Sequence, residues 1–253
     1  MDVDSYLARI GYCGCRAPVA ETLRALHRAH LEAVPFENLD IHLGRPIVFD
    51  ETWLYDKIVR QWRGGFCYEL NGLFAALLRC LGFAVTLLSA RVVDESGEVG
   101  PEFDHLTLKV ETAGPWLADV GFGDGFSEPL RLEESGVQVH DGTDYRVSAQ
   151  GADWLMSRCE PGGDWQDRYH FSLTPRRLGD FAAKCRYHQT SRASHFTRGR
   201  ICSRRTSEGL VTLTDDRLVV TDAGGRRETR VDGEPAFRMA LAERFGIKVL
   251  PID

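Results

Sequence analysis

One cysteine in this sequence stands where a nucleophile can be made reactive. Cys67 follows Gly64 and Gly65 and opens a segment with helical periodicity, in RGGFCYELNG. A cysteine attacks as the thiolate, and its pKa falls at a helix N-terminus or beside an imidazolium. The glycines give the backbone the freedom to bring this side chain close to a substrate. A free cysteine is more often an inert buried residue than a catalyst. Whether Cys67 is a nucleophile therefore depends on a base and an acid elsewhere in the sequence that could activate it.

A histidine and an aspartate that could activate Cys67 lie in one later segment, FDHLTLKVETAGPWLADVGFGDG, residues 103–125. His105 and Asp119 stand in two strand-like stretches separated by a turn-forming sequence, so we predict a β-hairpin that carries both. In such a hairpin a carboxylate can orient an imidazole, which then takes the proton of a thiol. The alternative is a strand-end histidine and a turn-entering aspartate, which are common at such places.

The strand register decides whether the two side chains meet. If the turn is 111–114, Val110 faces Pro115, and His105 then faces position 120, one residue from Asp119. Directly opposed side chains lie about 5 Å apart at Cβ, but a slip of one residue turns a side chain to the other face. The pair therefore needs a bulge or a shifted turn.

A glycine-rich loop, GFGDG at 121–125, comes directly after Asp119. It does not match a dinucleotide-binding fingerprint, because Phe126 stands where that pattern needs its third glycine, and it has no Walker lysine. Its exposed N–H groups could hold a pyrophosphate beside the predicted site. Taken alone, this pattern is weak evidence for a pyrophosphate-binding loop.

The elements that must position these residues are first of all helices. PVAETLRALHRAHLEA, residues 18–33, carries apolar residues at helical spacing, and Pro35 ends it. After Cys67, apolar residues fall at i, i+3, i+4, i+7, i+8 and i+11 counted from Leu70, which predicts one long amphipathic helix closed by Gly82. The cysteine is therefore predicted at a helix N-terminus.

Beyond residue 82 the pattern changes to strands, and the last part is mixed. The middle part, interpreted as a small antiparallel barrel or sandwich, has predicted strands at 84–93, 105–111, 116–120, 144–149, 153–160 and 167–173. The last part has predicted helices at 178–189 and 234–246 and strands near 200–203, 209–213 and 217–221. Without repeats or a low-complexity linker, the three parts are expected to pack as one α+β unit.

The charge of the chain limits its partners. A net charge of −6 disfavours nucleic acid as a partner. The distribution is uneven, since residues 176–205 hold nine basic residues and one acid, a local balance of +8 that leaves −14 elsewhere. This basic segment could capture a compact anion such as a phosphorylated cofactor, and a solvated face is the alternative.

The remaining composition points to an ordinary cytoplasmic protein. No signal peptide and no apolar run of membrane-spanning length is present, so we expect no membrane association. Seven scattered cysteines without a C-x-x-C pair argue against a disulfide framework and a zinc knuckle. No metal is expected, and His27 and His30 are interpreted as solvated helix histidines rather than ligands.

Three motifs together, RGGFCYELN, DHLTLKV and LADVGFGDG, resemble the arylamine N-acetyltransferase family in residue order and spacing. The resemblance extends upstream to VPFENLDIHLG and downstream to DRYHFSLTPRRLGDF and SRASHFTRG, so it covers nearly the whole chain. It implies that Cys67 is the acetyl-accepting nucleophile, His105 its base and Asp119 the residue that orients His105. The implied fold has a cysteine-protease-like core, with a helical domain (1–82), a β-barrel domain (83–175) and a small α/β lid (176–253).

The same resemblance implies roles for further residues. Phe36, Phe122 and Phe196 match positions that line the acyl and amine pocket of the family, with ordinary core aromatics as the alternative. Glu37 and Arg63 resemble an ion pair that braces the cysteine loop. The residues expected at coenzyme A, besides the basic segment after Arg192, are Phe103, Gly121, Gly123 and Phe196.

The implied reaction is acetyl transfer from acetyl-coenzyme A to an arylamine or hydrazine by a ping-pong mechanism, through a thioester on Cys67. Two alternatives stay open. One is an amide synthase of the same superfamily that acts on a bulky carrier-bound acyl thioester, and the other is a Cys-His-Asp hydrolase. The expected partners are small molecules, bound by a monomer or a homodimer. The sequence names neither the physiological amine nor the preferred acyl donor.

Overall fold

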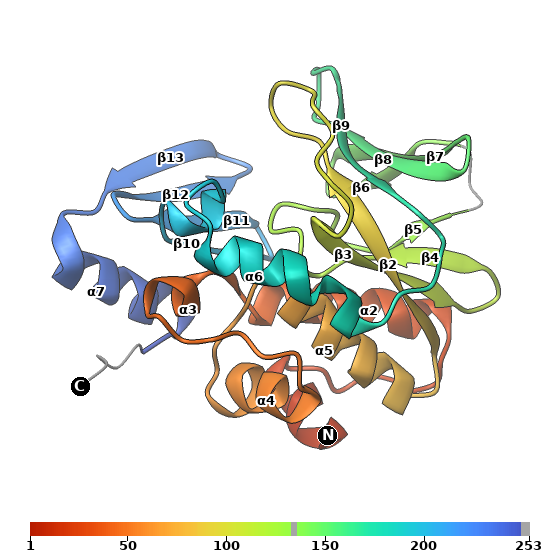
Figure 1. The fold of residues 1–253 in the computed structure, drawn as a ribbon, viewed down its shortest axis with the longest axis horizontal. Coiled ribbons are helices and arrows are strands. Elements are labelled where there is room, and N and C mark those ends of the chain that lie inside the picture. The colour runs from red at the N-terminus through yellow and green to blue at the C-terminus, as the bar shows by residue number, and fades with distance from the viewer. Residues whose placement is uncertain (133–135, 249–253) are drawn as a thin grey trace.

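The computed structural model of the chain describes residues 1–132 and 136–248. Within these residues, eight strands form one sheet and five form a second, and Figure 1 shows the two sheets side by side above the helices of the N-terminal part. This is the predicted α+β class. The N-terminal helices are α1 (Val3–Arg9), α2 (Ala20–Ala33), α3 (Leu39–His42), α4 (Glu51–Tyr55), a π-helical turn η1 (Asp56–Arg60) and α5 (Cys67–Cys80).

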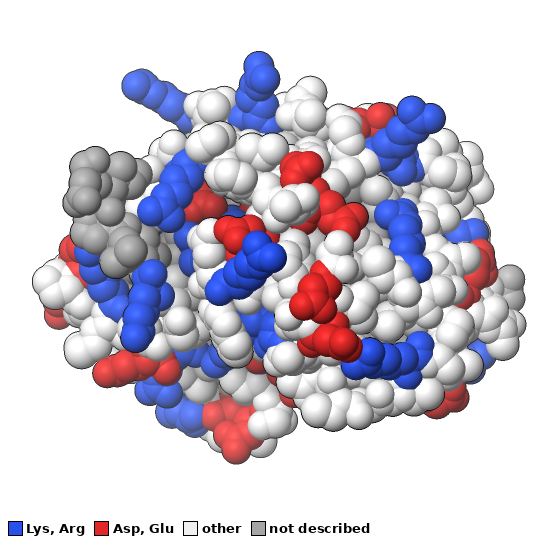
Figure 2. Space-filling model, turned by 90° about the horizontal axis from the view of Figure 1, so that it is seen from below, with Lys and Arg blue, Asp and Glu red and all other residues white. Residues whose placement is uncertain are grey.

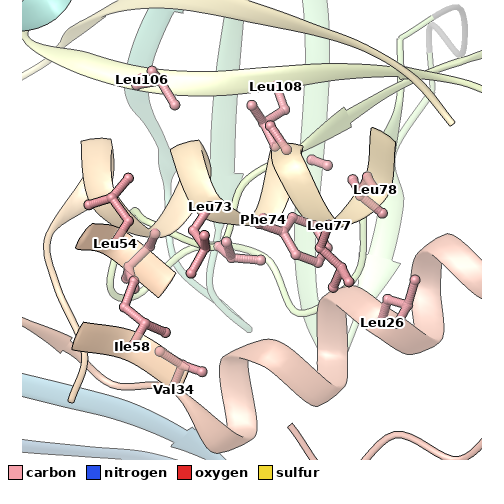
Figure 3. Packing of buried hydrophobic residues seen from close by; sticks show 14 of the residues in the cluster. Leu26, Val34, Leu54, Ile58, Leu73, Phe74, Leu77, Leu78, Leu106 and Leu108 are labelled. Atoms are coloured by element: carbon pink, nitrogen blue, oxygen red, sulfur yellow. The ribbon is translucent and has the colours of Figure 1, made fainter. Parts of the chain in front are cut away.

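Helix α5 forms the centre of the N-terminal part. Five of the six residues in its predicted apolar stripe, those from Leu70 to Leu78, are fully buried, and Leu81 at the end of the stripe is partly buried. Figure 3 shows this stripe between helix α2, which presents Leu26, and the strand that carries Leu106 and Leu108. The helix is thus buried on two sides, as expected for an element with a wide apolar face.

The start of α5 is fixed by a side chain from its own first turn. Glu69 reaches back and accepts the N–H of Phe66 at 3.1 Å. This contact satisfies a donor that a helix N-terminus otherwise leaves unpaired. Cys67 is therefore the first residue of the helix, as the sequence pattern predicted.

The larger sheet is an antiparallel barrel that is nearly closed. Neighbours follow the order β5-β4-β3-β2-β9-β8-β7-β6, which leaves β5 and β6 at the two edges. A side chain joins these edges, because Gln138 accepts the N–H of Arg131 at 2.7 Å and donates to its carbonyl oxygen at 3.0 Å. The strands are β2 (Ala84–Val92), β3 (His105–Glu111), β4 (Pro115–Ala118), β5 (Leu130–Arg131), β6 (Gln138–His140), β7 (Thr143–Gln150), β8 (Asp153–Cys159) and β9 (Trp165–Phe171).

The β3–β4 hairpin differs from its predicted register by one residue. Pro115 faces Glu111 rather than Val110, because the turn consists of three residues and the Thr112 N–H donates to Gly114 O at 3.0 Å. Continued in this register, the ladder would place residue 119 opposite residue 107, which shares a face with residue 105. The shifted turn that the sequence argument required is therefore present, and the two site residues lie diagonally on one face.

The second sheet joins both ends of the chain. Strand β1 (Phe36–Glu37) comes from the N-terminal part and pairs with β10, with Phe36 facing Ser203. The predicted lid therefore shares its sheet with the helical part. The other elements of this region are the short 3-10 helices η2 (Leu178–Phe181) and η3 (His195–Thr197), helix α6 (Ala182–Thr190), strands β10 (Ile201–Thr206), β11 (Gly209–Thr214), β12 (Arg217–Asp222) and β13 (Gly225–Arg230), and helix α7 (Gly233–Phe245).

The main hydrophobic core crosses the predicted boundaries at residues 82 and 175. It joins Leu73 of α5 to Leu106 of the barrel and to Phe181 of the last part. Separate clusters fill the barrel around Phe171 and the space between the second sheet and α7 around Phe237. The division into three domains stays a prediction, since the parts share one core.

Candidate active site

The glycine loop before the cysteine runs against a second stretch of chain. Glu37 donates its N–H to the carbonyl oxygen of Gly65 at 2.8 Å. A Cβ on Gly64 would lie 1.9 Å from the carbonyl oxygen of Pro35, so only glycine permits this approach. This close backbone contact determines where Cys67 stands.

A buried network of five charged side chains surrounds this loop. Arg63 contacts Glu37 at 2.7 Å and Asp40 at 2.9 Å. Lys57 contacts Asp40 at 2.8 Å and Glu69 at 2.7 Å. The predicted pair of Glu37 and Arg63 is thus present, but it belongs to a larger network that the sequence did not indicate. Because Glu69 also caps α5, the network connects the loop to the first turn of the helix.

The network carries three carboxylates and two cations, and burial changes how they ionise. Burial raises the pKa of Glu69 to about 7, against the opposing charge of Lys57. Burial also disfavours charge on Lys57 and Arg63, but the neighbouring carboxylates outweigh it and raise the pKa of both groups. A proton on Glu69 would cancel the surplus negative charge, and its raised pKa favours that proton up to about neutral pH.

His105 and Asp119 are in direct contact. Nε2 of His105 lies 2.6 Å from Oδ2 of Asp119, and both side chains are buried. Oδ1 of Asp119 accepts the Gly121 N–H at 3.0 Å. Burial disfavours the ionised carboxylate, but the charge and hydrogen bond of His105, with the other donors, lower the pKa of Asp119 below its usual value. The aspartate is therefore held as an anion that fixes the imidazole.

One amide side chain ties together the three elements of the site. Asn71, on the helix that Cys67 opens, donates to Leu106 O at 2.7 Å and to Asp119 Oδ1 at 2.8 Å. Its own oxygen accepts the Val120 N–H at 2.9 Å. The helix N-terminus, strand β3 and the end of β4 are thereby held at fixed distances. The sequence did not single out Asn71, because an asparagine inside a helix carries no distinctive signal.

Cys67 lies against the loop that follows Asp119 and close to the strand that carries His105. A Cβ on Gly121 would lie 2.7 Å from Cys67 Cα, so the loop after Asp119 is in contact with the start of α5. The thiol is also within hydrogen-bonding reach of the backbone at Leu106, the residue after His105. Burial raises the pKa of the Cys67 thiol well above its usual range, since only 3 % of the residue is exposed. The thiol therefore needs a nearby base to take its proton.

Two aromatic rings pack on the imidazole of His105. Phe122 lies 5.1 Å from it and Tyr169 lies 5.4 Å from it, measured between ring centroids. Tyr169 is fully buried and Phe122 is partly exposed. These rings shield the imidazole from water on their side and hold it in one orientation.

The other residues predicted to line the pocket or to contact coenzyme A fall into two groups. Phe36 and Phe196 are neighbours, with ring centroids 6.1 Å apart, and Gly123 lies beside Phe36. Phe103 instead packs on Phe181 at 5.2 Å. Phe36, Phe196 and Phe103 are all partly exposed, which is what aromatic residues that line a cleft require.

The backbone at Phe103 is held in an unusual conformation. Its φ is 66°, a left-handed value that costs a bulky residue about 1–3 kcal/mol. Its N–H donates to Ser89 Oγ at 2.8 Å, and its carbonyl oxygen accepts the Tyr68 hydroxyl at 2.8 Å. Tyr68 follows Cys67, so the residue next to the cysteine fixes the backbone just before His105.

A second polar group connects the start of β3 to the last part of the chain. Asp104 contacts Lys184 at 3.0 Å and His188 Nε2 at 3.3 Å, and His188 Nδ1 lies 3.1 Å from Ser194 Oγ. The His188 ring also lies 5.1 Å from that of Phe196. This group places the Phe196 segment beside the strand of His105. Asp104 and Lys184 lie 80 positions apart in the sequence, and although Asp104 and Ser194 stand in the motifs DHLTLKV and SRASHFTRG, nothing in these motifs indicated the contact.

The basic segment is less available than its composition suggested. Figure 2 shows positive and negative side chains interspersed on the face seen from below. Four of the nine basic residues in 176–205 are paired with carboxylates from elsewhere, so their charge is largely offset. These pairs are Arg176 with Glu102, Lys184 with Asp104, Arg200 with Asp215 and Glu234, and Arg205 with Asp141.

The interpretation of His27 and His30 as solvated histidines is wrong. Both are fully buried, and they lie on the same face of α2 as Leu23 and Leu26. Their positions at i+4 and i+7 from Leu23 were the signal, since that spacing continues the apolar stripe. Within the described residues, no three His, Cys, Asp or Glu side chains are grouped to hold a metal ion. The helices described there are too short or too polar to cross a bilayer.

Comparison with known proteins gives consistent matches. A family model described as N-acetyltransferase matches residues 20–252. The arylamine N-acetyltransferase of Mycolicibacterium smegmatis is 36% identical over 98% of this chain and 92% of its own. The solved structure of the Salmonella typhimurium arylamine N-acetyltransferase has a TM-score of 0.93 and 33% identity, covering 99% of this chain and 93% of that one. The Mycobacterium marinum arylamine N-acetyltransferase, solved in complex with CoA, has a TM-score of 0.90 and 33% identity, covering 97% and 93%.

Proposed function

The chain belongs to the arylamine N-acetyltransferase family, and on this premise we propose that its reaction passes through a thioester on Cys67. As an acyltransferase of this family, it uses acetyl-coenzyme A to N-acetylate arylamines. We extend the acceptors to hydrazines, whose terminal nitrogen is a comparable nucleophile. Cys67 is the nucleophile, His105 its base and Asp119 the residue that orients His105.

The observation that carries this proposal is the meeting of three elements at one point. Cys67 opens α5, the loop of Gly121 lies against it, and His105 is bound to Asp119 at 2.6 Å within the same cluster. With Nε2 of His105 committed to Asp119, Nδ1 is the ring nitrogen left to exchange a proton with the thiol. A buried thiol, an oriented base and a fixed anion together support nucleophilic acyl transfer.

The first half-reaction forms the acetyl thioester. The Cys67 thiol gives its proton to His105, and the sulfur attacks the acetyl carbonyl of acetyl-coenzyme A. The tetrahedral intermediate collapses as the bond to the coenzyme A sulfur breaks, and His105 returns the proton to that leaving thiolate. The α5 N-terminus favours the thiolate over the thiol, and Asp119 stabilises the imidazolium that forms beside it.

The second half-reaction transfers the acetyl group to nitrogen. The amine attacks the thioester of Cys67, the C–S bond breaks, and the amine proton passes through His105 to the cysteine. Because a thioester is exchanged for a thioester in the first step, the acyl group stays activated until the amine arrives. Water must be kept out meanwhile, and the rings of Phe122 and Tyr169 cover one side of His105.

We assign the surrounding residues by their placement. Phe36, Phe122 and Phe196 are proposed to line the pocket of the acyl group and the aromatic amine. Phe103, Gly121, Gly123 and Phe196 are proposed to contact coenzyme A. Glu37 and Arg63 support the cysteine loop through their buried ion pair. The seven cysteines are unpaired, which suits the reducing cytoplasm, and we propose a monomer or homodimer there.

Mass spectrometry after mixing with acetyl-coenzyme A tests this mechanism. One acetyl group is expected on Cys67, and it should disappear when an arylamine is added. Cys67→Ala should take up no acetyl group, whereas Cys202→Ala, which removes another buried cysteine, should still be acetylated. Turnover by an enzyme that never carries the adduct would overturn the mechanism. Acylation only by a bulky carrier-bound thioester would indicate an amide synthase, and amide cleavage without coenzyme A a hydrolase.

A further inference from the structure

His27 holds both ends of the glycine-rich loop that follows Asp119. It lies on α2 and is completely buried. Its Nε2 accepts the N–H of Asp119 at 3.1 Å, and its Nδ1 lies 3.1 Å from the carbonyl oxygen of Ser127. Neither partner is near it in sequence, so one side chain of the helical part fixes the entry and the exit of residues 119–127.

These two contacts determine the protonation state of the imidazole. A carbonyl oxygen only accepts hydrogen bonds, so Nδ1 of His27 carries a proton and donates it to Ser127. A backbone N–H only donates, so Nε2 must be unprotonated to accept from Asp119. The neutral Nδ1–H form alone satisfies both. Burial lowers the pKa of His27 to about 4, which favours this same form.

The backbone at Asp119 needs an acceptor from outside the sheet. Strand β4 ends at Ala118, whose partner Leu108 is the last residue of the β3–β4 ladder on that side. The N–H of Asp119 therefore has no partner in the ladder, and an unpaired buried N–H is costly. His27 supplies the missing acceptor. Its ring is itself fixed by stacking on Phe126 at 5.7 Å and by an edge contact with Phe74 at 6.2 Å.

We propose that His27 is a positioning residue for the acyl-transfer site, which sets the orientation of Asp119 and of the loop 119–127 through its neutral Nδ1–H form. This inference rests on the proposed function. The chain of contacts is short: His27 fixes the Asp119 backbone, Asp119 binds His105 at 2.6 Å, and His105 exchanges the proton of Cys67. The titratable groups that face His27 are His30 on its own helix, and Asp119 and His140 from the barrel.

Three substitutions separate the two hydrogen bonds from the packing. His27→Gln can keep an acceptor where Nε2 stands, and His27→Asn can keep a donor where Nδ1 stands. His27→Phe keeps an aromatic ring and loses both bonds. The matched control is His30→Phe, which replaces a buried histidine one turn away whose Nδ1 contacts the hydroxyl of Tyr6 instead.

The measurement is the rate of alkylation of Cys67 by iodoacetamide from pH 5 to pH 9, with the labelled peptide identified by mass spectrometry. In His27→Asn and His27→Phe we expect the rate at pH 7 to fall about tenfold or more, the effect of losing one buried hydrogen bond, with the pH profile moved upward. His27→Gln should stay within about threefold of the wild type. His30→Phe should lower the unfolding temperature but leave the profile unchanged.

If all three His27 variants have the same alkylation profile as the wild type and differ from it only in thermal stability, His27 merely fills space and the proposal is overturned. So would wild-type behaviour of His27→Asn. The assay contains no acyl donor, so it is independent of the proposed reaction. If wild-type protein is alkylated as expected but takes up no acetyl group from acetyl-coenzyme A, the proposed function fails and the role of His27 stands.

Discussion

Arginine and carboxylate side chains pair in two very different parts of this chain. Behind the cysteine loop, Arg63 contacts Glu37 at 2.7 Å with both side chains almost completely buried. On the β12–β13 hairpin, Arg217 contacts Glu228 at 3.5 Å with both side chains about half exposed. Solvent screens the second pair, whereas the first pair is shielded from bulk solvent by its burial. Removing one partner should therefore change the stability of the protein very differently in the two pairs, although the chemical groups are the same.

The difference lies in what is left behind when one partner is removed. At the hairpin, water and salt solvate the remaining charge, and such exposed pairs contribute little. In the buried network, the remaining carboxylate would be stranded without solvent. Breaking a buried pair from one side is therefore strongly destabilising, even where the intact pair adds little to stability. The buried pairs constrain the position of Cys67, whereas the exposed pairs constrain only a surface hairpin.

The largest expected effect is that of Arg63→Met. The substitution leaves Glu37 without its cation and leaves Asp40 with Lys57 alone, so we expect the free energy of unfolding to fall by about 3–5 kcal/mol. Urea unfolding monitored by circular dichroism measures it. Arg63→Lys is the matched control and should be milder, because a charge remains. A loss below about 1 kcal/mol for Arg63→Met would mean that the network is solvated like a surface pair.

The next effect depends on pH and concerns Glu69. The fold raises its pKa from 4.5 to about 7, so the folded protein binds an extra proton between these values. Wild-type stability should therefore fall as pH rises through this window, by up to about 3 kcal/mol. Glu69→Gln copies the neutral acid and cannot titrate, so it should lack this decline. Unfolding curves measured at pH 5 and at pH 8 test this. If the loss of stability between the two pH values is the same in the wild type and in Glu69→Gln, the prediction is contradicted.

An intermediate effect is expected at Asp104, whose environment lies between the two extremes. Its carboxylate is partly buried and contacts Lys184 at 3.0 Å and His188 at 3.3 Å. Burial raises its pKa, but these partners outweigh it and lower the pKa below 3.8, so its contribution is present above that pH and is lost as pH falls below it. Asp104→Asn should cost about 1–3 kcal/mol at pH 7. Thermal unfolding measures the loss, and a difference that persists at pH 2 would argue against a charge effect.

The smallest effect is expected at the exposed hairpin. Arg217→Gln removes the contact with Glu228, and we expect no measurable change in unfolding midpoint or acetylation rate, since solvent replaces the lost partner. The unfolding midpoints should be measured at low and at high salt, and the wild type and the variant should have the same midpoint at both salt concentrations. A clear destabilisation that disappears with salt would show that the hairpin is more strongly coupled by charge than its exposure indicates.

Local patterns predicted the parts of this fold whose periodicity is strong. Helix α5 was predicted to within a residue at its start, because five of its apolar residues line one face. The hairpin with His105 and Asp119 was predicted as an element, but its register was not. A turn of three residues rather than four moves every facing pair by one, and the sequence ETAG permits both.

Contacts between distant segments could not be predicted. Lys57 and Glu69 look like ordinary surface residues of a helical region, yet both are buried, where they contact each other at 2.7 Å and belong to one network of charged side chains. His27 was misinterpreted because a histidine counts as polar in a periodicity argument, although its spacing places it on the apolar face. A polar residue can be buried only where side chains or backbone groups of other elements supply its hydrogen bonds, and those partners are known only once the chain is folded.

Strand β1 is only two residues long, yet its pairing determines when the site can form while the chain is being synthesised. Its partners on β10, Ser203 and Cys202, are synthesised about 165 residues later. A nascent chain that already contains Cys67, His105 and Asp119 still lacks the strand that pairs with the segment beside the glycine loop. Contacts of such long sequence separation form late. We therefore expect a ribosome-bound chain to acquire a reactive thiol only after strand β10 has been made and has paired with β1.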